Sequence, residues 1–372
     1  MSTGSPSSLA STKRRLTHVA SHLRTPKLKV VVCRDLGPNV MPLLRDRPEI
    51  DLVVWPEDKP CERPWLLENI RGAAGVLVML SDKVNQELID AAGPSLKVAS
   101  TMSVGYEHVD LPVVAKAGVR IGYTPDVLTD AVADLTVMLA LMASRNGGEA
   151  VSLVQSGGWP SFSWSPFGLC GPQISASPFS PKRTVGFLGF GRIAQATLAR
   201  LVPFGITHCL FTSNPSSTAD PAFEAAIAAK YGVQVRRVGL DELARESDVL
   251  VVLAPGGART HHVVNEEVLR KMKKTAVLVN TARGTVVDSD ALARALREGW
   301  IWGAGLDVVE GEPNVTADHP LVKEPRAVVL PHLGSATIET RLGMATLAAK
   351  NLLGGLGLEE GMPAELDVKS RA

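Results

Sequence analysis

A glycine-rich turn near the middle of the chain narrows the possible folds more sharply than any other stretch. Gly189-Phe190-Gly191-Arg192-Ile193-Ala194 directly follows an apolar run that begins at Thr184, and an amphipathic stretch follows it. A G-x-G-x-x-A string between a strand and a helix is typical of a dinucleotide pyrophosphate site. The glycines allow a tight turn and a close approach to phosphate, and the helix N-terminus attracts negative charge. We therefore expect Gly189, Gly191, Arg192 and Ile193 to bind a dinucleotide.

Short apolar runs alternate with helical stretches on both sides of this turn. Such alternation is typical of parallel sheets that are covered by helices. The first set of runs lies at 29–33, 51–55, 75–79, 96–99 and 119–122. The second set lies at 184–189, 208–211, 233–235, 248–253, 276–279, 303–306 and 328–330. The sequence thus predicts two doubly wound α/β domains with a cleft between them, in a chain too long for a single core of about 250 to 300 residues.

Three further segments complete the expected organisation. Apolar periodicity predicts a long helix over about 131–145, with Thr129 or Asp130 as its N-cap. Segment 157–182 is rich in Pro, Gly and Ser and predicts an irregular loop, whose aromatic side chains are expected to pack on something. A last helix is expected over about 336–356.

Composition excludes several classes of partner. With 39 Lys and Arg against 38 Asp and Glu, the net charge is +1, so a nucleic-acid partner is not expected. The apolar stretch 131–143 is interrupted by Asp134 and is shorter than the ~20 residues that span a bilayer, so no membrane association is expected.

The four cysteines are far apart in the sequence and form no C-x-x-C pair. We expect reduced thiols, no metal site and a cytoplasmic protein. Residues 1–27 form a basic segment without acidic side chains, which is either an unstructured tail or a mitochondrial transit peptide.

Polar side chains follow three successive strands of the second domain. Arg283 comes just after the run 276–279, Asp307 and Glu312 follow the run 303–306, and His332 follows the run 328–330. The carboxyl ends of parallel strands are where such sheets bind ligands. Arg283 can hold a substrate carboxylate through two hydrogen bonds. His332 can donate a proton near neutral pH, and Glu312 can orient it. Together with the dinucleotide turn, these residues predict reduction of a small keto acid by hydride transfer.

The loop after the second strand of this domain bears on the choice of coenzyme. Its sequence, Thr212-Ser213-Asn214-Pro215, contains no acid that could hold a ribose 2′-hydroxyl. Ser213 and Asn214 can instead donate to a 2′-phosphate, and Arg236 or Arg237 can supply positive charge if the fold brings it near. We therefore expect NADP(H) to be preferred, with NAD(H) possible.

These motifs resemble the D-isomer-specific 2-hydroxyacid dehydrogenases from about Lys29 onward. Their patterns are all present in order, as N-T-A-R-G at 280–284, G-L-D-V with E-P at 305–313, and P-H-L-G-S-A-T at 331–337. The likeness is nearest to the glyoxylate and hydroxypyruvate reductases. It implies a discontinuous substrate-binding domain of 28–128 plus 332–372, an NAD(P)-binding domain of 129–331, and a homodimer.

The resemblance also implies roles for individual residues. Arg283, Glu312 and His332 match the family's catalytic residues. The matching cofactor positions, beyond those named above, are Thr281, Asp307 and Gly334. The substrate carboxylate would meet Ser81 and the backbone N–H groups of Val104 and Gly105, and either Trp164 or Phe162 would reach the neighbouring subunit's active site.

Two groups of alternatives stay open at this point. Phosphoglycerate, D-lactate and formate dehydrogenases share the fold, although Glu312 disfavours formate oxidation, which transfers no proton. A dinucleotide-sensing co-repressor would keep the same Arg, Glu and His without turnover, since a fold and a site do not fix a function.

Overall fold

The first set of apolar runs forms a five-stranded parallel sheet in the computed structural model, which describes Met1 and residues 26–214 and 220–368. Most of the basic N-terminal segment, residues 2–25, lies outside these ranges. The strands pair in the order β2-β1-β3-β4-β5. Their bounds are Leu28–Val32 (β1), Ile50–Val54 (β2), Gly75–Val78 (β3), Val98–Thr101 (β4) and Arg120–Gly122 (β5).

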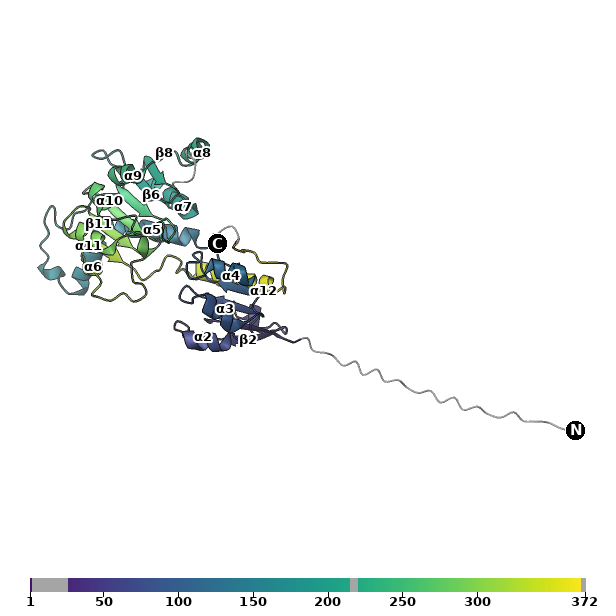
Figure 1. Ribbon diagram of the computed structural model, residues 1–372. Helices are drawn as coiled ribbons and strands as arrows, with labels where there is room; N and C mark the ends of the chain where they lie inside the picture. The colour runs from purple at the N-terminus through teal and green to yellow at the C-terminus, as the bar shows by residue number, and fades with distance from the viewer. Residues whose placement is uncertain (2–25, 215–219, 369–372) are drawn as a thin grey trace.

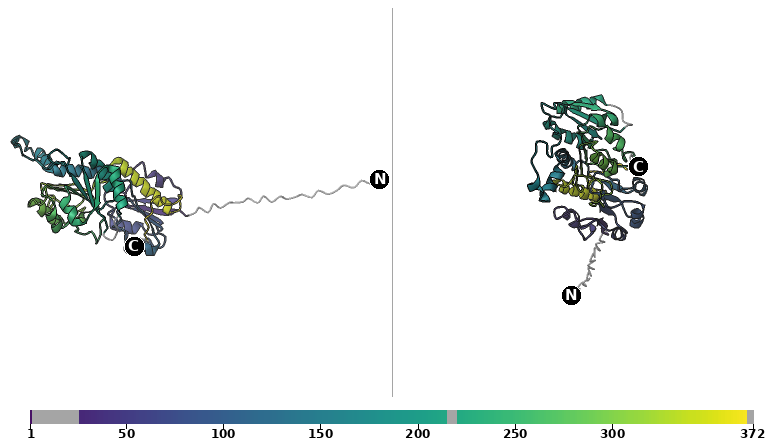
Figure 2. Two further views of the ribbon diagram at one scale, coloured as in Figure 1. Left: turned by 90° about the horizontal axis from the view of Figure 1, so that it is seen from above. Right: turned by 90° about the vertical axis from the view of Figure 1, so that its left-hand side faces the viewer.

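Alternating side chains of this sheet enter two separate cores. Val31 and Val76 pack on one face with helices α2 (Arg63–Asn69), α3 (Gln86–Ala92) and α4 (Leu111–Ala117), whereas Val30 and Leu77 pack on the other. This division follows from the two-residue period of a strand. The second face is covered by the short helix α1 (Pro42–Arg45) and by α12 (Ile338–Gly355), which comes from the far end of the chain (Figures 1 and 2).

The second set of runs forms a seven-stranded parallel sheet in the order β12-β11-β10-β9-β6-β7-β8. The chain starts at β6 and winds first one way and then the other, so a crevice opens where the direction changes between β6 and β9. The bounds are Thr184–Leu188 (β6), His208–Thr212 (β7), Gln234–Arg237 (β8), Val249–Val252 (β9), Val277–Asn280 (β10), Gly303–Leu306 (β11) and Ala327–Val329 (β12). The expected fold class, two doubly wound α/β sheets, is confirmed.

Helices cover both faces of the seven-stranded sheet. One face packs on α5 (Thr129–Ser144), α7 (Arg192–Leu201) and α8 (Pro221–Tyr231). The other packs on α9 (Leu240–Glu246), α10 (Glu266–Lys271) and α11 (Ser289–Arg297). The chain passes between the two sheets twice, after β5 and after β12. In the described part of the chain, no helix is both long and apolar enough to cross a bilayer.

One local expectation was wrong. Helix α5 begins at Thr129, and its N-cap is Leu128, which forms no side-chain cap bond. Asp130, one of the two expected N-caps, instead forms an ion pair with Arg200 on α7. Three aromatic side chains of segment 157–182 are largely exposed in this chain: Trp159, Trp164 and Phe167 are 65%, 81% and 86% exposed. They follow α6 (Gly147–Gln155), which has no buried residue and projects with this loop from the body of the molecule (Figure 2).

Candidate active site

The glycine-rich turn joins β6 to α7 and leaves space for a phosphate group. Gly189 has φ +90°, and a Cβ there would lie 2.9 Å from the Ala254 backbone nitrogen, so only glycine suits this position. A Cβ built on Gly191 would meet nothing within 4 Å. Gly191 is also the N-cap of α7, and no side chain caps the helix there. This open, uncapped helix end fits a dinucleotide pyrophosphate.

Arg192 is the first residue of α7, and its Nε lies 2.6 Å from Oδ1 of Asp126. Asp126 belongs to the segment that leaves the five-stranded sheet. Both side chains are more than half exposed, so the pair contributes little stability. Arg192 is therefore free to exchange this carboxylate for a phosphate.

Asp307, a predicted cofactor residue, also anchors the segment that carries the histidine. It directly follows β11, and its side chain is buried. Its carboxylate accepts hydrogen bonds from the backbone N–H groups of Leu333 (2.6 Å) and Gly334 (2.8 Å), and its carbonyl accepts one from His332 (2.9 Å). Burial raises the pKa of Asp307 above its usual value, although the two N–H donors act in the opposite direction.

The remaining predicted cofactor positions lie at the same edge of the sheet. The Thr281 hydroxyl is 2.8 Å from the Thr136 hydroxyl on α5. Ser213 and Asn214 follow β7, and Nη2 of Arg237 donates to the carbonyl of Asn214 at 3.1 Å. Arg237 thus reaches the loop expected to surround the ribose, whereas Arg236 pairs with Glu242 at 2.8 Å.

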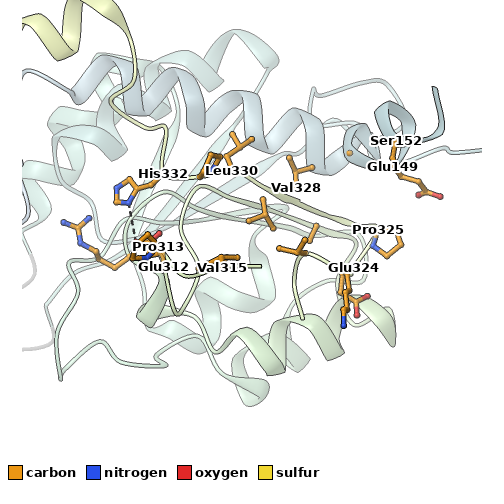
Figure 3. Close-up of a pocket in the computed structure, with 18 of the residues that line it drawn as sticks. Glu149, Ser152, Glu312, Pro313, Val315, Glu324, Pro325, Val328, Leu330 and His332 are labelled. Carbon is orange, nitrogen blue, oxygen red and sulfur yellow. Dashed lines mark ion pairs between the residues drawn. The ribbon is translucent and has the colours of Figure 1, made fainter. Parts of the chain in front are cut away.

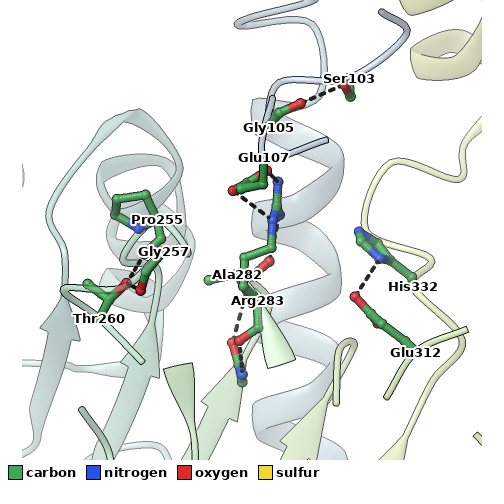
Figure 4. Close-up of polar contacts among 11 residues, drawn as sticks. Ser103, Gly105, Glu107, Pro255, Gly257, Thr260, Ala282, Arg283, Glu312 and His332 are labelled. Carbon is green, nitrogen blue, oxygen red and sulfur yellow. Dashed lines mark hydrogen bonds and ion pairs between the residues drawn. The ribbon is translucent and has the colours of Figure 1, made fainter. Parts of the chain in front are cut away.

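Glu312 follows β11 and His332 follows β12, and their side chains face each other. Nδ1 of His332 lies 3.4 Å from Oε1 of Glu312, and the two side chains are 38% and 30% exposed (Figure 4). His332 has φ +55°, a backbone conformation that is rare for residues other than glycine. The hydrogen bonds to Asp307 hold the backbone in this conformation. Because Nδ1 faces the carboxylate, Nε2 is the ring atom available to a substrate.

Arg283 lies between the two sheets and pairs with a residue that the sequence analysis missed. Its Nε and Nη2 donate to Oε1 and Oε2 of Glu107 at 3.1 and 3.2 Å, and its Nη1 donates to the Ala282 carbonyl at 2.7 Å (Figure 4). The turn below it is braced by buried Asn280, which bonds to the Ala282 N–H and the Arg283 carbonyl. Glu107 follows Gly105 just past β4, which is the same strand-end signal that identified Arg283.

The predicted substrate residues are brought together in part. Gly105 lies against the Arg283 guanidinium, because a Cβ there would be 1.6 Å from Nη2. Among the described residues, neither Val104 nor Gly105 uses its backbone N–H in a hydrogen bond. Ser81 lines the pocket with Leu80. Trp164 does not line it, so its predicted role depends on a second subunit.

A pocket of about 1110 Å³ connects these groups. The five-stranded half contributes Ser81 and Glu107, and the other half contributes Arg283, Glu312 and His332. From the histidine it extends past Val328 and Pro325 to Glu149 and Ser152 on α6 (Figure 3). A carboxylate-binding arginine and a proton donor paired with an acid therefore share one cavity.

A second group of histidines has the composition of a metal site, although the sequence analysis predicted none. His261, His262 and Glu310 have ligand atoms within 4.8 Å of one another. The two rings stack with centroids 4.0 Å apart, so their in-plane lone pairs run side by side and do not converge. His262 Nε2 lies 2.6 Å from Glu310, which also accepts the Ser289 N–H. These contacts connect the chain segments that contain His262, Ser289 and Glu310.

The chain is similar to known reductases over most of its length. Residues 137–334 match the family model described as D-isomer specific 2-hydroxyacid dehydrogenase, NAD binding domain. A glyoxylate reductase/hydroxypyruvate reductase from Homo sapiens is 42% identical over 339 residues, covering 91% of this chain and 98% of the relative. A glyoxylate reductase from Thermofilum pendens is 41% identical, covering 87% and 90%.

Solved structures give the same relationship. A crystal structure of an NADPH-dependent glyoxylate/hydroxypyruvate reductase from Sinorhizobium meliloti, in complex with NADP and malonate, aligns with a TM-score of 0.74 and 30% identity. The alignment covers 92% of this chain and 97% of that one.

Proposed function

This chain belongs to the D-isomer-specific 2-hydroxyacid dehydrogenase family, and we propose that it reduces glyoxylate and hydroxypyruvate to glycolate and D-glycerate with a nicotinamide dinucleotide. The observation that carries the proposal is the shared cavity, in which Arg283 lies across from the His332–Glu312 pair. The similarity to reductases of these two acids supports the choice of substrates.

Each site residue has a separate task in this reaction. Arg283, with the N–H groups of Val104 and Gly105, binds the substrate carboxylate and fixes the orientation of the keto acid. The bound dinucleotide supplies the hydride. As the carbonyl carbon becomes tetrahedral, negative charge develops on its oxygen, and His332 donates the proton on Nε2 to that oxygen. Glu312 stabilises the imidazolium before the transfer and keeps Nε2 directed at the substrate.

A substrate panel tests the proposal directly. We expect the highest kcat/KM with glyoxylate or hydroxypyruvate among these two acids, pyruvate and phosphohydroxypyruvate, each measured with NADPH and with NADH. A preference for pyruvate or phosphohydroxypyruvate would indicate a D-lactate or phosphoglycerate type of enzyme. Tight NADH binding without turnover of any acid would favour a sensor protein.

The coenzyme preference is a narrower proposal, for which Arg237 is the main support. Residues 212–218 include no acid, and Arg237 donates to the carbonyl of Asn214 in this segment, which supports a role for Arg237 in binding a ribose 2′-phosphate. We expect Arg237→Gln to lower kcat/KM for NADPH by about 10- to 100-fold, the effect of losing one charged hydrogen bond, with little change for NADH. Arg236→Gln is the matched control, because Arg236 pairs with Glu242. Equal losses for both coenzymes in the Arg237 variant would count against a 2′-phosphate contact.

A homodimer is a further proposal, supported by the exposed apolar side chains of the projecting arm. Val151 and Val154 on α6 are 49% and 51% exposed, and Trp159 and Trp164 follow them. Burying such side chains is favourable. Light scattering should give twice the chain mass, and Trp159→Glu should shift the protein toward the monomer. A monomeric wild type would refute this assembly.

The cellular location also remains a proposal. Dispersed cysteines favour the reducing cytoplasm, while the basic segment 1–27 favours mitochondrial import as the alternative. Imaging of the full chain fused at its C-terminus to a fluorescent protein distinguishes the two, since mitochondrial fluorescence would exclude the cytoplasmic assignment.

A further inference from the structure

Glu107 and Arg283 form an ion pair that bridges the two halves of the molecule. Glu107 lies in the turn after β4 of the five-stranded sheet, and Arg283 follows β10 of the seven-stranded sheet. The carboxylate contacts the side of the guanidinium through two parallel hydrogen bonds of 3.1 and 3.2 Å (Figure 4). A fork of this kind fixes the plane of the arginine as well as its charge.

The donors of Arg283 are only partly used by these contacts. A guanidinium carries five N–H donors. Nε and one N–H of Nη2 bond to Glu107, and one N–H of Nη1 bonds to the Ala282 carbonyl. One N–H remains on each Nη atom, which is enough to hold a second carboxylate at the end of the guanidinium. Glu107 and a substrate carboxylate can therefore bind Arg283 at the same time.

Two glycines, one from each half of the molecule, lie close against the pair. A Cβ on Gly105 would lie 1.6 Å from Nη2 of Arg283 and 2.5 Å from Oε2 of Glu107. A Cβ on Gly256, in the other half, would lie 3.0 Å from Cγ of Arg283 and 3.5 Å from Oε1 of Glu107. The Gly105 turn is itself held by the Ser103 hydroxyl, which donates to the Gly105 carbonyl at 2.7 Å. The orientation of the arginine is thus set by packing as well as by charge.

The charges around Glu107 keep it ionised for this role. Partial burial acts to raise its pKa, but Arg283 outweighs burial and holds the pKa of Glu107 below its usual value. The other ionisable group that acts on it is His108. Burial lowers the pKa of His108 to about 4, so this histidine is neutral near pH 7 and does not compete with Arg283 for the carboxylate.

We propose that Glu107 is a positioning residue that holds Arg283 from the side, so that the two remaining N–H groups face the substrate carboxylate. The inference rests on the proposed function, in which Arg283 binds that carboxylate. It assigns to Glu107 no contact with the reacting atoms. The fork joins the two halves, so the orientation of Arg283 depends on how the halves are placed relative to each other.

The test compares Glu107→Gln with Glu365→Gln in the full-length protein. Glu365 forms the same kind of fork with Arg120, at 2.8 and 2.5 Å, away from the pocket. We expect Glu107→Gln to lower kcat/KM for glyoxylate on the order of 10- to 100-fold, mainly through KM, as for other small misplacements of a binding group. NADPH affinity and the Tm should stay near the wild-type values. Glu365→Gln should leave the kinetics unchanged.

Two further measurements separate positioning from a general structural effect. Oxamate, a small acid with a carbonyl beside its carboxylate, should bind the NADPH complex of Glu107→Gln more weakly than it binds wild type. In Arg283→Ala, free guanidinium below the onset of unfolding should restore part of the activity, and adding Glu107→Gln should raise the concentration needed for this rescue.

The outcomes are distinguishable from failure of the proposed function. Wild-type kinetics or unchanged oxamate affinity in Glu107→Gln would overturn the positioning role. A lower KM would also overturn it, because Glu107 would then compete with substrate for Arg283. If the wild type reduces no keto acid, the proposed function fails, while weaker oxamate binding in Glu107→Gln would still support the positioning of Arg283.

Discussion

His332→Ala is expected to lose most keto-acid reduction while it still binds NADPH. General acid catalysis contributes about 10²- to 10⁴-fold to a rate, and His332 is the proton donor of the proposed mechanism. The loss should appear in kcat, because the carboxylate is held by Arg283 on the other side of the pocket. Stopped-flow measurement of a single turnover, with NADPH affinity from fluorescence titration, separates the chemical step from binding.

The matched control for this variant is His208→Ala. His208 begins β7, at the end of the strand opposite the dinucleotide turn, and its Nδ1 lies 2.8 Å from the Thr207 hydroxyl. We expect it to leave kcat unchanged. Near-normal turnover by the His332 variant would show that His332 is not the proton donor. A joint loss of turnover and NADPH binding would indicate that the backbone around His332 has lost its folded conformation.

Arg283→Lys should raise KM for glyoxylate and also lower kcat. An ammonium keeps the charge but cannot reproduce the planar fork, so neither Glu107 nor the substrate carboxylate would be held in two parallel hydrogen bonds. Losing one charged hydrogen bond corresponds to about 10- to 100-fold in kcat/KM. Steady-state kinetics with saturating NADPH measure both constants.

The control is Arg120→Lys, which alters the comparable fork with Glu365 outside the pocket. It should change the Tm at most slightly, since an exposed ion pair contributes about 0 to 1 kcal/mol. If the KM and kcat of Arg283→Lys equal those of the wild type, Arg283 does not bind the substrate.

The sequence predicted those parts of the site that depend on local order along the chain. Apolar runs placed Arg283, Glu312 and His332 at strand ends, and parallel strands bring such ends to one edge. Glu107 also lies past a strand end, but its pairing was missed because Arg283 is 176 positions away and belongs to the other sheet. A pairing between domains depends on how they close, which no local pattern contains.

Other differences have the same origin in tertiary contacts. The long helix begins at Thr129 with an uncapped end, and Asp130 pairs instead with Arg200 of the neighbouring helix. Asp307 was predicted only as a cofactor residue, and its three backbone bonds to the His332 segment became evident from the structure.

The two passages of the chain between the sheets matter for protein engineering. Asp126, the partner of Arg192, lies in the first passage, and His332 lies at the start of the second. The backbone that connects the two halves therefore also sets the direction of the proton donor. Changes that stiffen or loosen these passages would alter product release and proton transfer together. Substitutions meant to change product release without changing proton transfer would have to lie outside these passages, for example along the pocket wall between Val328 and α6.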